Sequence, residues 1–173
     1  QASMLDASVM DGGAPTDGGI PVDMGVPDAG APPDTGSGCW SQTCVGEEPC
    51  SCSEGCCVFD ATAEGTVLCT LTASCEIDAS DSNMDITCAG GASCVIDASE
   101  GNGAIHCAGL GTLCEIDCTD ASDCAVSCVG PAQCLVNCTS ATNCPGPSGA
   151  FAACHGGATS CPGNVEVCNR PCP

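Results

Sequence analysis

The sequence predicts an all-β fold: a disulfide-rich β-solenoid of about four coils, each with roughly 19–21 residues and two short strands. The first observation behind this prediction is that residues 69–144 nearly repeat themselves. The first cysteine of each row is Cys69, Cys88, Cys107 or Cys128, and the second is Cys75, Cys94, Cys114 or Cys134. A nearly fixed period of this length is typical of stacked repeats in which each row forms one coil.

The second observation is the alternation of side chains within each row. Ile86-x-Cys88 places two apolar side chains on one face, and Cys94-x-Ile96-x-Ala98 does the same. Because side chains alternate across a strand, we expect both segments to be strands with one face in the interior. The links 89–92 and 99–103 are rich in Gly and small polar residues, which are typical of turns.

The third observation is that cysteines bracket the turns. We predict six local disulfides as a hypothesis, since connectivity cannot be deduced from sequence alone. They are Cys69–Cys75, Cys88–Cys94, Cys107–Cys114, Cys128–Cys134, Cys118–Cys124 and Cys138–Cys144. The last two bridge the opposite turn, where Ala79 and Ala98 take the equivalent positions of earlier rows. The later coils then carry two cross-links each, which matters because a thin interior buries little apolar surface.

Composition indicates an exported protein. A content of 22 cysteines in 173 residues is typical of an oxidising compartment, so we predict that the chain is secreted and lies outside the cell or on its surface. Its start at Gln1 rather than Met suggests that a signal peptide has been removed. No apolar run is long enough for membrane insertion. The formal net charge of −21 excludes nucleic acid and anionic membranes as partners.

The N-terminal 38 residues differ from the rest. Residues 1–10 are predicted to be a donor strand, because Leu5-Asp6-Ala7-Ser8 copies the pattern of Ile77-Asp78-Ala79-Ser80, although such a short match also arises by chance in a chain this rich in Ala, Ser and Asp. Residues 11–38, rich in Gly, Pro and Asp, are predicted to be a linker. Thr16, Thr35 and Ser37 beside prolines are candidate sites for O-glycans.

Two cysteine-rich segments flank the repeats. Residues 39–68 begin with six cysteines in 39–57, which predicts a small disulfide-knotted cap over the first coil. A thiolate metal site is the alternative, but the paired C-x₂-C spacing usual for zinc is absent. Residues 145–173 hold four more cysteines and are predicted to form a second disulfide cap.

Acidic residues supply the candidate metal ligands. Asp81, Asn83 and Asp85 offer oxygen ligands at alternate positions, as calcium loops do. Stacking of the coils would also place Asp78, Asp97 and Asp117 in one outward column, whose mutual repulsion a cation would relieve. The alternative is an acidic face that is simply solvated. Calcium is the one cofactor that these patterns suggest.

The sequence contains no catalytic constellation, so we predict that the protein is not an enzyme. His106 precedes Cys107 and His155 follows Cys154. A Cys–His pair indicates a nucleophile only when the thiol is free and reactive. In a chain this dense in disulfides, we expect both cysteines to be bonded.

Two resemblances bear on the fold. The segments Cys118–Cys124 and Cys138–Gly146 resemble the repeats of beetle antifreeze proteins, which are disulfide-bridged β-solenoids with an ice-binding ladder of Thr-x-Thr. Here Asp117 and Asn137 stand where the first threonine of that motif would be, before Thr119 and Thr139. The linker, the repeats and the ending VCNRPCP resemble exported Cys-rich proteins of the myxobacterial type, a compositional likeness that implies no activity.

We therefore expect an extracellular structural protein, a homopolymer whose subunits form a fibre or surface filament by donating the N-terminal strand. A monomeric module that binds calcium or adheres to a surface is the competing class, and ice binding is a further alternative. The donor strand is expected to place Leu5 and Ala7 inward, level with a column such as Ile77 and Ala79.

Overall fold

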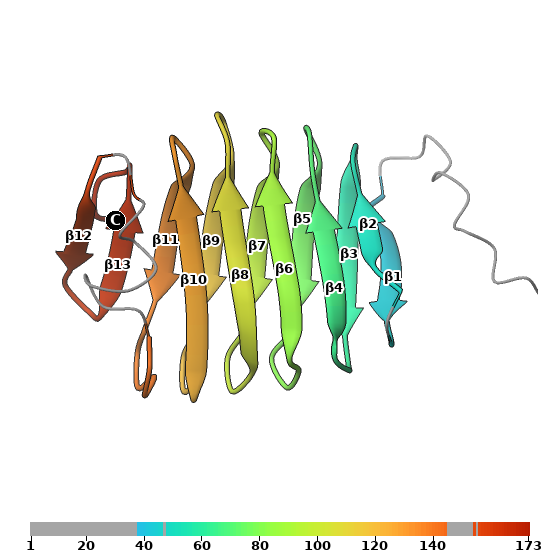
Figure 1. The fold of residues 1–173 in the computed structure, drawn as a ribbon, viewed down its shortest axis with the longest axis horizontal. Helices are drawn as coiled ribbons and strands as arrows, with labels where there is room; N and C mark the ends of the chain where they lie inside the picture. Colours follow the sequence, from blue (N-terminus) through green and yellow to red (C-terminus); the bar gives the residue numbers. More distant parts are fainter. Residues whose placement is uncertain (1–37, 47, 145–153, 155) are drawn as a thin grey trace, which may run out of the picture. The chain divides into compact units, whose positions relative to one another are not determined.

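The computed structural model describes residues 38–46, 48–144, 154 and 156–173, all of which belong to the compact unit 33–173. The described residues form two sheets and no helix (Figure 1). The first sheet contains, in spatial order, β1 (Trp40–Cys44), β3 (Cys56–Ala61), β5 (Ser74–Asp78), β7 (Ser93–Asp97), β9 (Leu113–Asp117), β11 (Gln133–Asn137), β13 (Val165–Cys168) and β12 (Ala158–Cys161). The second contains β10 (Asp123–Val129), β8 (Asn102–Ala108), β6 (Met84–Ala89), β4 (Gly65–Cys69) and β2 (Cys50–Cys52).

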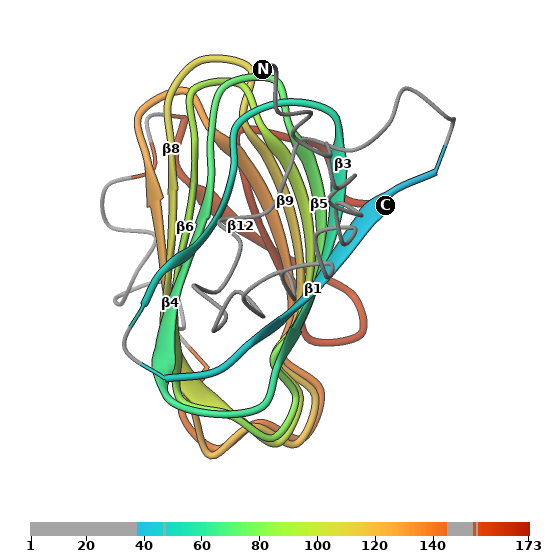
Figure 2. The ribbon, with the colours of Figure 1, turned by 90° about the vertical axis from the view of Figure 1, so that its right-hand side faces the viewer.

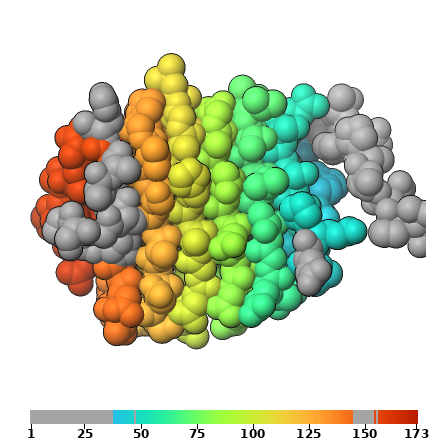
Figure 3. Space-filling view, in the orientation of Figure 1, coloured from blue at the N-terminus to red at the C-terminus, as the bar shows by residue number. Residues whose placement is uncertain are grey.

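The chain alternates between the two sheets and so winds into coils. Figure 2, viewed along the stack, shows the sheets as opposite walls, and Figure 3 shows successive coils as bands across one face. Neighbouring strands from β1 to β11 run parallel, with equivalent residues side by side, such as Cys75 beside Cys94 and Cys94 beside Cys114. The predicted all-β, disulfide-rich β-solenoid is therefore confirmed.

The core consists of side-chain columns that run along the stack. One column of the first sheet contains Phe59, Ile77, Ile96, Ile116 and Val136, and the facing column of the second contains Val67, Ile86, Ile105 and Val126; all are at most 2 % exposed. Only one aromatic side chain, Phe59, is fully buried among the described residues. The remaining buried side chains are mostly Cys and Ala, so the core is as thin as expected.

A polar residue lies at each end of the apolar column of the first sheet. The register places Gln42 beside Phe59 in the first coil and Glu166 beside Val136 at the other end. Ser160 donates a 2.7 Å hydrogen bond to Glu166 Oε1, while Glu166 Oε2 is buried without a partner among the described residues. A side chain that needs water or a polar partner closes the column, so further coils cannot simply continue the apolar core.

The solenoid begins earlier than predicted. The six cysteines of 39–57 do bond among themselves, as Cys39–Cys56, Cys44–Cys50 and Cys52–Cys57. However, β1 to β4 form two regular coils of the stack rather than a separate cap. Shorter turns hide these coils in the sequence: partner positions step by 17 residues from Trp40 to Cys57, against 20 from Cys94 to Cys114.

The C-terminal segment closes one end of the first sheet. β13 pairs antiparallel with β11, and β12 pairs antiparallel with β13. Disulfides Cys154–Cys168 and Cys161–Cys172 cross-link this hairpin. The described part of 145–173 thus forms a disulfide-bonded cap, and the reversal of strand direction ends the parallel winding.

All six local disulfides proposed from the spacing are present in the structure, and all cysteines are paired. Where the opposite turn lacks a disulfide, the backbones come close instead. Gly103 lies level with Cys124 and against Met84, and a Cβ at position 103 would overlap the Met84 carbonyl oxygen. A cavity of only about 10 Å³ remains there, because the buried Met84 side chain occupies the space.

Candidate functional site

The outer face of the first sheet carries the aspartate column. The register places Asp78 beside Asp97 and Asp97 beside Asp117, as the sequence predicts. Asp60 extends the column at one end and Asn137 at the other. All four aspartates are exposed, and Asn137 is half-buried. We call this set, Asp60, Asp78, Asp97, Asp117 and Asn137, the aspartate ladder.

Most rungs of the ladder perform a local structural task at the start of a turn. In Asp97, Oδ1 accepts hydrogen bonds from the Ser99 backbone N–H (3.0 Å) and hydroxyl (2.6 Å). Asp78 does the same with Ser80, Asp117 with Thr119 and Asn137 with Thr139. Such side-chain bonds to the residue two positions on stabilise turns. This recurrence explains the Asp-x-Ser and Asp-x-Thr pattern without any ligand.

The residues of the predicted calcium loop alternate between the outer surface and the interior of the coil. Asp81, Asn83 and Asp85 are exposed, and they alternate with buried Ser82 and Met84. Asp85 belongs to β6 in the second sheet, whereas the ladder lies on the first. Among the described residues, no three carboxylates have oxygens within 4.8 Å of one another, and the groups that do meet this distance consist of disulfide-bonded cysteines. No three of the proposed aspartate ligands therefore meet at one point.

A shallow groove runs along the ladder. Its volume is about 450 Å³, and its other wall is formed by the neighbouring outward column of Glu76, Val95, Glu115 and Leu135. Val95 is 52 % exposed and supplies an apolar patch between the two glutamates. One wall of the groove is thus mainly acidic, and the other alternates between acidic and apolar side chains.

The only Arg or Lys of the chain reaches this same face. Arg170 Nη1 lies 3.2 Å from Glu115 Oε1. Together with Pro171, Arg170 lines a second hollow of about 400 Å³ beside Val95 and Leu113. The Glu115 side chain is 56 % exposed and that of Arg170 is 23 % exposed, so solvent screens the pair and we expect it to add at most about 1 kcal/mol to stability. It shows that the C-terminal segment lies across the sheet.

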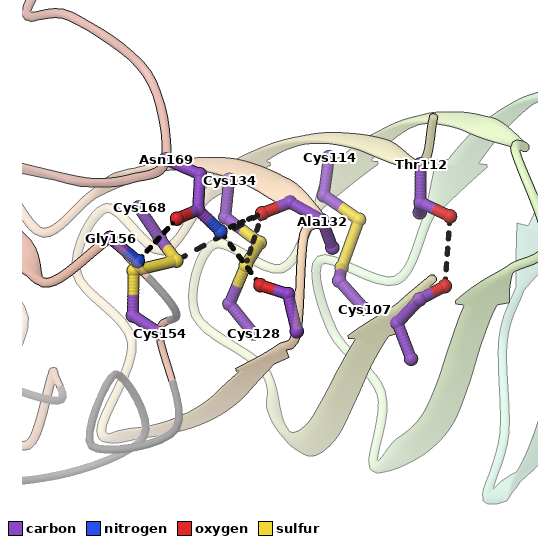
Figure 4. Close-up of a disulfide and its surroundings, with 12 residues drawn as sticks. Cys107, Thr112, Cys114, Cys128, Ala132, Cys134, Cys154, Gly156, Cys168 and Asn169 are labelled. Atoms are coloured by element: carbon purple, nitrogen blue, oxygen red, sulfur yellow. Dashed lines mark hydrogen bonds between the residues drawn. A yellow bond between two sulfur atoms is a disulfide. The ribbon is translucent and has the colours of Figure 1, made fainter. Parts of the chain in front are cut away.

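Asn169 fixes the C-terminal cap to the solenoid, a role that the sequence analysis missed. Its side-chain nitrogen donates to the carbonyls of Gly130 (2.8 Å) and Ala132 (2.7 Å), and its oxygen accepts from the Gly156 N–H at 2.7 Å (Figure 4). Asn169 has φ 56°, a left-handed conformation that Asn tolerates well. The signal in the sequence that could have indicated this role was an Asn directly before Arg170-Pro171.

Thr112 was also missed. It is fully buried at a position where the neighbouring coils have Ala92 and Ala132. Its hydroxyl donates to the Ala108 carbonyl (2.8 Å) and accepts from the Gly91 N–H (3.1 Å) of the preceding coil. A hydroxyl at a position otherwise occupied by buried alanines indicated a hydrogen-bond partner, but only the fold shows which groups the partners are.

Neither cysteine beside a histidine offers a free thiol. Cys107 is bonded to Cys114 and is fully buried, whereas His106 points outward from the second sheet. Cys154 is bonded to Cys168, and His155 lies outside the described residues.

β10 is the last described strand of the second sheet. Its ends are held, since the Cys124 N–H donates to the Asn143 carbonyl (3.4 Å) and Gly130 bridges to Cys154. No described strand pairs with the stretch between them. An edge strand whose backbone groups have no partner can template another strand.

No known protein family matches the sequence, and no curated protein or solved structure is significantly similar to it. In the part of the chain that the structure describes, no helix has the length and apolar character needed to cross a membrane.

Proposed function

We propose that the protein is an extracellular structural protein whose subunits join head to tail into a filament by strand donation. The observation that carries the proposal is that β10 is the last described strand of a parallel sheet and has no described strand on its outer side. The donor is the predicted strand of residues 1–10, which lies outside the described residues, as do the linker up to residue 37 and the candidate glycan sites.

The disulfide framework supports an extracellular role. Eleven disulfides pair every cysteine of the chain, and such a set persists only in an oxidising environment. The described residues otherwise offer a rod of repeated coils with acidic side chains outside. A cross-linked rod of this kind suits a load-bearing or protective element.

The position of β10 determines whether donation propagates. The chain enters the solenoid at the β1 end, and β10 lies at the opposite end. A strand donated to β1 or β2 of another subunit would join two equivalent ends, which closes into a dimer. A strand donated to β10 joins unlike ends, so β10 of the donating subunit accepts a strand in turn and the contact repeats.

The side-chain pattern of the donor fits this edge. In a parallel register with Leu5 level with Val126, Ala7 lies level with Cys128. Leu5 would then extend the apolar column of Val67, Ile86, Ile105 and Val126. The sequence analysis suggested the column of Ile77 and Ala79 instead, but β13 already occupies that end of the first sheet. The linker averages roughly 30 Å as a flexible coil, which is enough to reach a neighbouring subunit.

Deletion of residues 1–10 tests the proposal, with negative-stain microscopy and size-exclusion chromatography as readouts. The full chain is expected to form filaments, and the deletion is expected to leave a folded monomer. A matched pair sharpens the test: Leu5→Asp with Ala7→Asp changes the inward positions, whereas Asp6→Asn with Ser8→Thr changes the outward ones. Only the first pair should abolish filaments.

Two results would overturn the proposal. Filaments that persist without residues 1–10 would exclude donation by this strand. Closed dimers of the full chain would show that the strand pairs with the β1 end, or that it joins subunits by another route.

A cation-binding module is the second candidate, and the in-register aspartate ladder favours it. The hydrogen bonds within these rungs use Oδ1 of Asp78, Asp97 and Asp117, which leaves Oδ2 of each as the candidate ligand atom. If calcium binds there, millimolar calcium should raise the melting temperature by mass action, and Asp97→Asn should weaken the shift. An unchanged melting temperature leaves a solvated acidic face.

A further inference from the structure

Sulfur atoms of neighbouring coils meet in two clusters inside the core. The Sγ atoms of Cys69, Cys88 and Cys94 all lie within 4.8 Å of one another. Those of Cys107, Cys114 and Cys134 do the same. We call these sets the first and second sulfur clusters.

Each cluster contains both sulfurs of one disulfide and one sulfur of the disulfide in a neighbouring coil. In the first, Cys88 and Cys94 are bonded, and Cys69 belongs to the preceding coil, where its partner is Cys75. In the second, Cys107 and Cys114 are bonded, and Cys134 comes from the following coil, where its partner is Cys128. Figure 4 shows these last two disulfides beside each other. One sulfur of each outer disulfide thus faces both sulfurs of its neighbour.

We propose that the two sulfur clusters are intramolecular thiol–disulfide exchange sites. When Cys69 is a thiolate, its sulfur attacks Cys88, a Cys69–Cys88 bond forms, the Cys88–Cys94 bond breaks, and Cys94 leaves as the thiolate. Attack on Cys94 releases Cys88 in the same way. The number of thiols and disulfides does not change, so the step needs no oxidant or reductant. The second cluster exchanges Cys134 with Cys107 and Cys114.

The packing favours exchange within the clusters over exchange with solvent. All six sulfur-bearing residues are at most 1 % exposed, so a thiol molecule from solution cannot reach them in the folded state. A thiolate held this close to a disulfide has a high effective concentration. Because the thiolate is the attacking species, exchange should accelerate as the pH rises.

Exchange of this kind would let the stack correct its own pairing. During oxidative folding, before the core has closed, a bond opened by a monothiol leaves one thiol in the chain, and a bond not yet made leaves two. The thiol can then move to the neighbouring coil, and a bond between coils can revert to the local bond, while both sheets stay paired.

A matched pair of variants tests the proposal. Cys75→Ser leaves Cys69, inside the first cluster, whereas Cys69→Ser leaves Cys75, which is not a member; both variants lose the same disulfide. The folded protein is held at about pH 8.5, close to the thiol's ordinary pKa, and then quenched in acid. Its thiol is labelled with an alkylating agent in denaturant, and the label is located by peptic digestion and mass spectrometry. We expect label on Cys69, Cys88 and Cys94 in Cys75→Ser, and on Cys75 alone in Cys69→Ser.

A second pair gives an independent result. Cys128→Ser leaves Cys134 inside the second cluster, and Cys134→Ser leaves Cys128 outside it. Far-UV circular dichroism establishes that each variant is folded. Label confined to Cys69 and to Cys134 in the cluster variants would overturn the proposal. Label scattered over cysteines outside the clusters would overturn it as well, because it would indicate exchange through unfolding.

The unmodified protein supplies a readout if a variant does not fold. After refolding of the reduced protein with a small monothiol and its disulfide, quenched in acid before oxidation is complete, peptides bonded between coils should join Cys69 to Cys88 or Cys94, or Cys134 to Cys107 or Cys114. Partially reduced protein that contains only local bonds would contradict the proposal.

Discussion

Two stretches of the same solenoid differ in the opposite turn of each coil, the turn that Cys118–Cys124 and Cys138–Cys144 bridge. The coils of β9 to β11 carry a disulfide in this turn, Cys118–Cys124 or Cys138–Cys144, in addition to the one at the first turn. The coils of β5 to β8 have Ala79 and Ala98 there instead. Their turns are also one residue shorter, since Ala98 to Gly103 corresponds to Cys118 to Cys124.

The difference shows that either a disulfide or a close backbone contact can stabilise the same course of the backbone through this turn. Gly103 allows its strand to approach Met84, and the buried Met84 side chain occupies the space that a disulfide takes elsewhere. The contact depends on a residue without a side chain, whereas the disulfide tolerates looser packing. The single remaining bond of these coils, such as Cys88–Cys94, should therefore matter more than either bond of a doubly cross-linked coil.

The largest expected effect follows from that contrast. Cys88→Ala with Cys94→Ala removes the only disulfide of its coil and should lower the free energy of unfolding by about 4 kcal/mol. Cys118→Ala with Cys124→Ala leaves Cys107–Cys114 in place and should cost about 2 kcal/mol. Urea unfolding of both double variants measures the difference. Equal losses would show that the number of bonds per coil does not matter, because both pairs span 6 residues.

The close approach at Gly103 predicts a smaller loss. Gly103→Ala introduces a Cβ that overlaps the Met84 carbonyl oxygen, so the two coils must separate, at a cost of about 1–3 kcal/mol. Gly38→Ala is the matched control, because its Cβ would meet nothing within 4 Å and its φ is not in the left-handed region. Urea unfolding that gives similar stabilities for the two variants would disprove the contact as the element that replaces the disulfide.

Thr112 offers a test at the boundary between the two stretches. Thr112→Val keeps the shape but leaves the Gly91 N–H without its acceptor, and should cost about 1–2 kcal/mol. Thr112→Ser keeps the hydroxyl and should lose less. Thermal unfolding of the two variants gives the comparison, and a Val variant as stable as the Ser variant would mean that water replaces the bond.

The repeat was accessible to sequence reasoning because period, alternation and cysteine spacing agree in residues 69–144. The first two coils were not, since their shorter turns break the period while Cys57-x-Phe59-x-Ala61 keeps the alternation. The C-terminal cap was predicted, but its antiparallel strands were not, because they are only four residues long and lie among glycines and prolines.

The candidate site, too, was predictable from the sequence only in part. The aspartate ladder was predictable, because register alone places Asp78, Asp97 and Asp117 in one column. Its hydrogen bonds to the following Ser and Thr were not foreseen, although the residues two positions on are the usual partners of an Asp at a turn. The contacts of Arg170 and Asn169 join positions 37–55 residues apart, and only the fold reveals them.

The central claim is that disulfides, rather than the thin core, hold the solenoid together. Its most direct test is far-UV circular dichroism with a thermal melt, on protein that is fully reduced and kept under reductant. We predict that the β signal is lost and that no cooperative melt remains, because the core has a single fully buried aromatic residue among those described. A reduced protein with an unchanged spectrum and melting temperature would contradict the account.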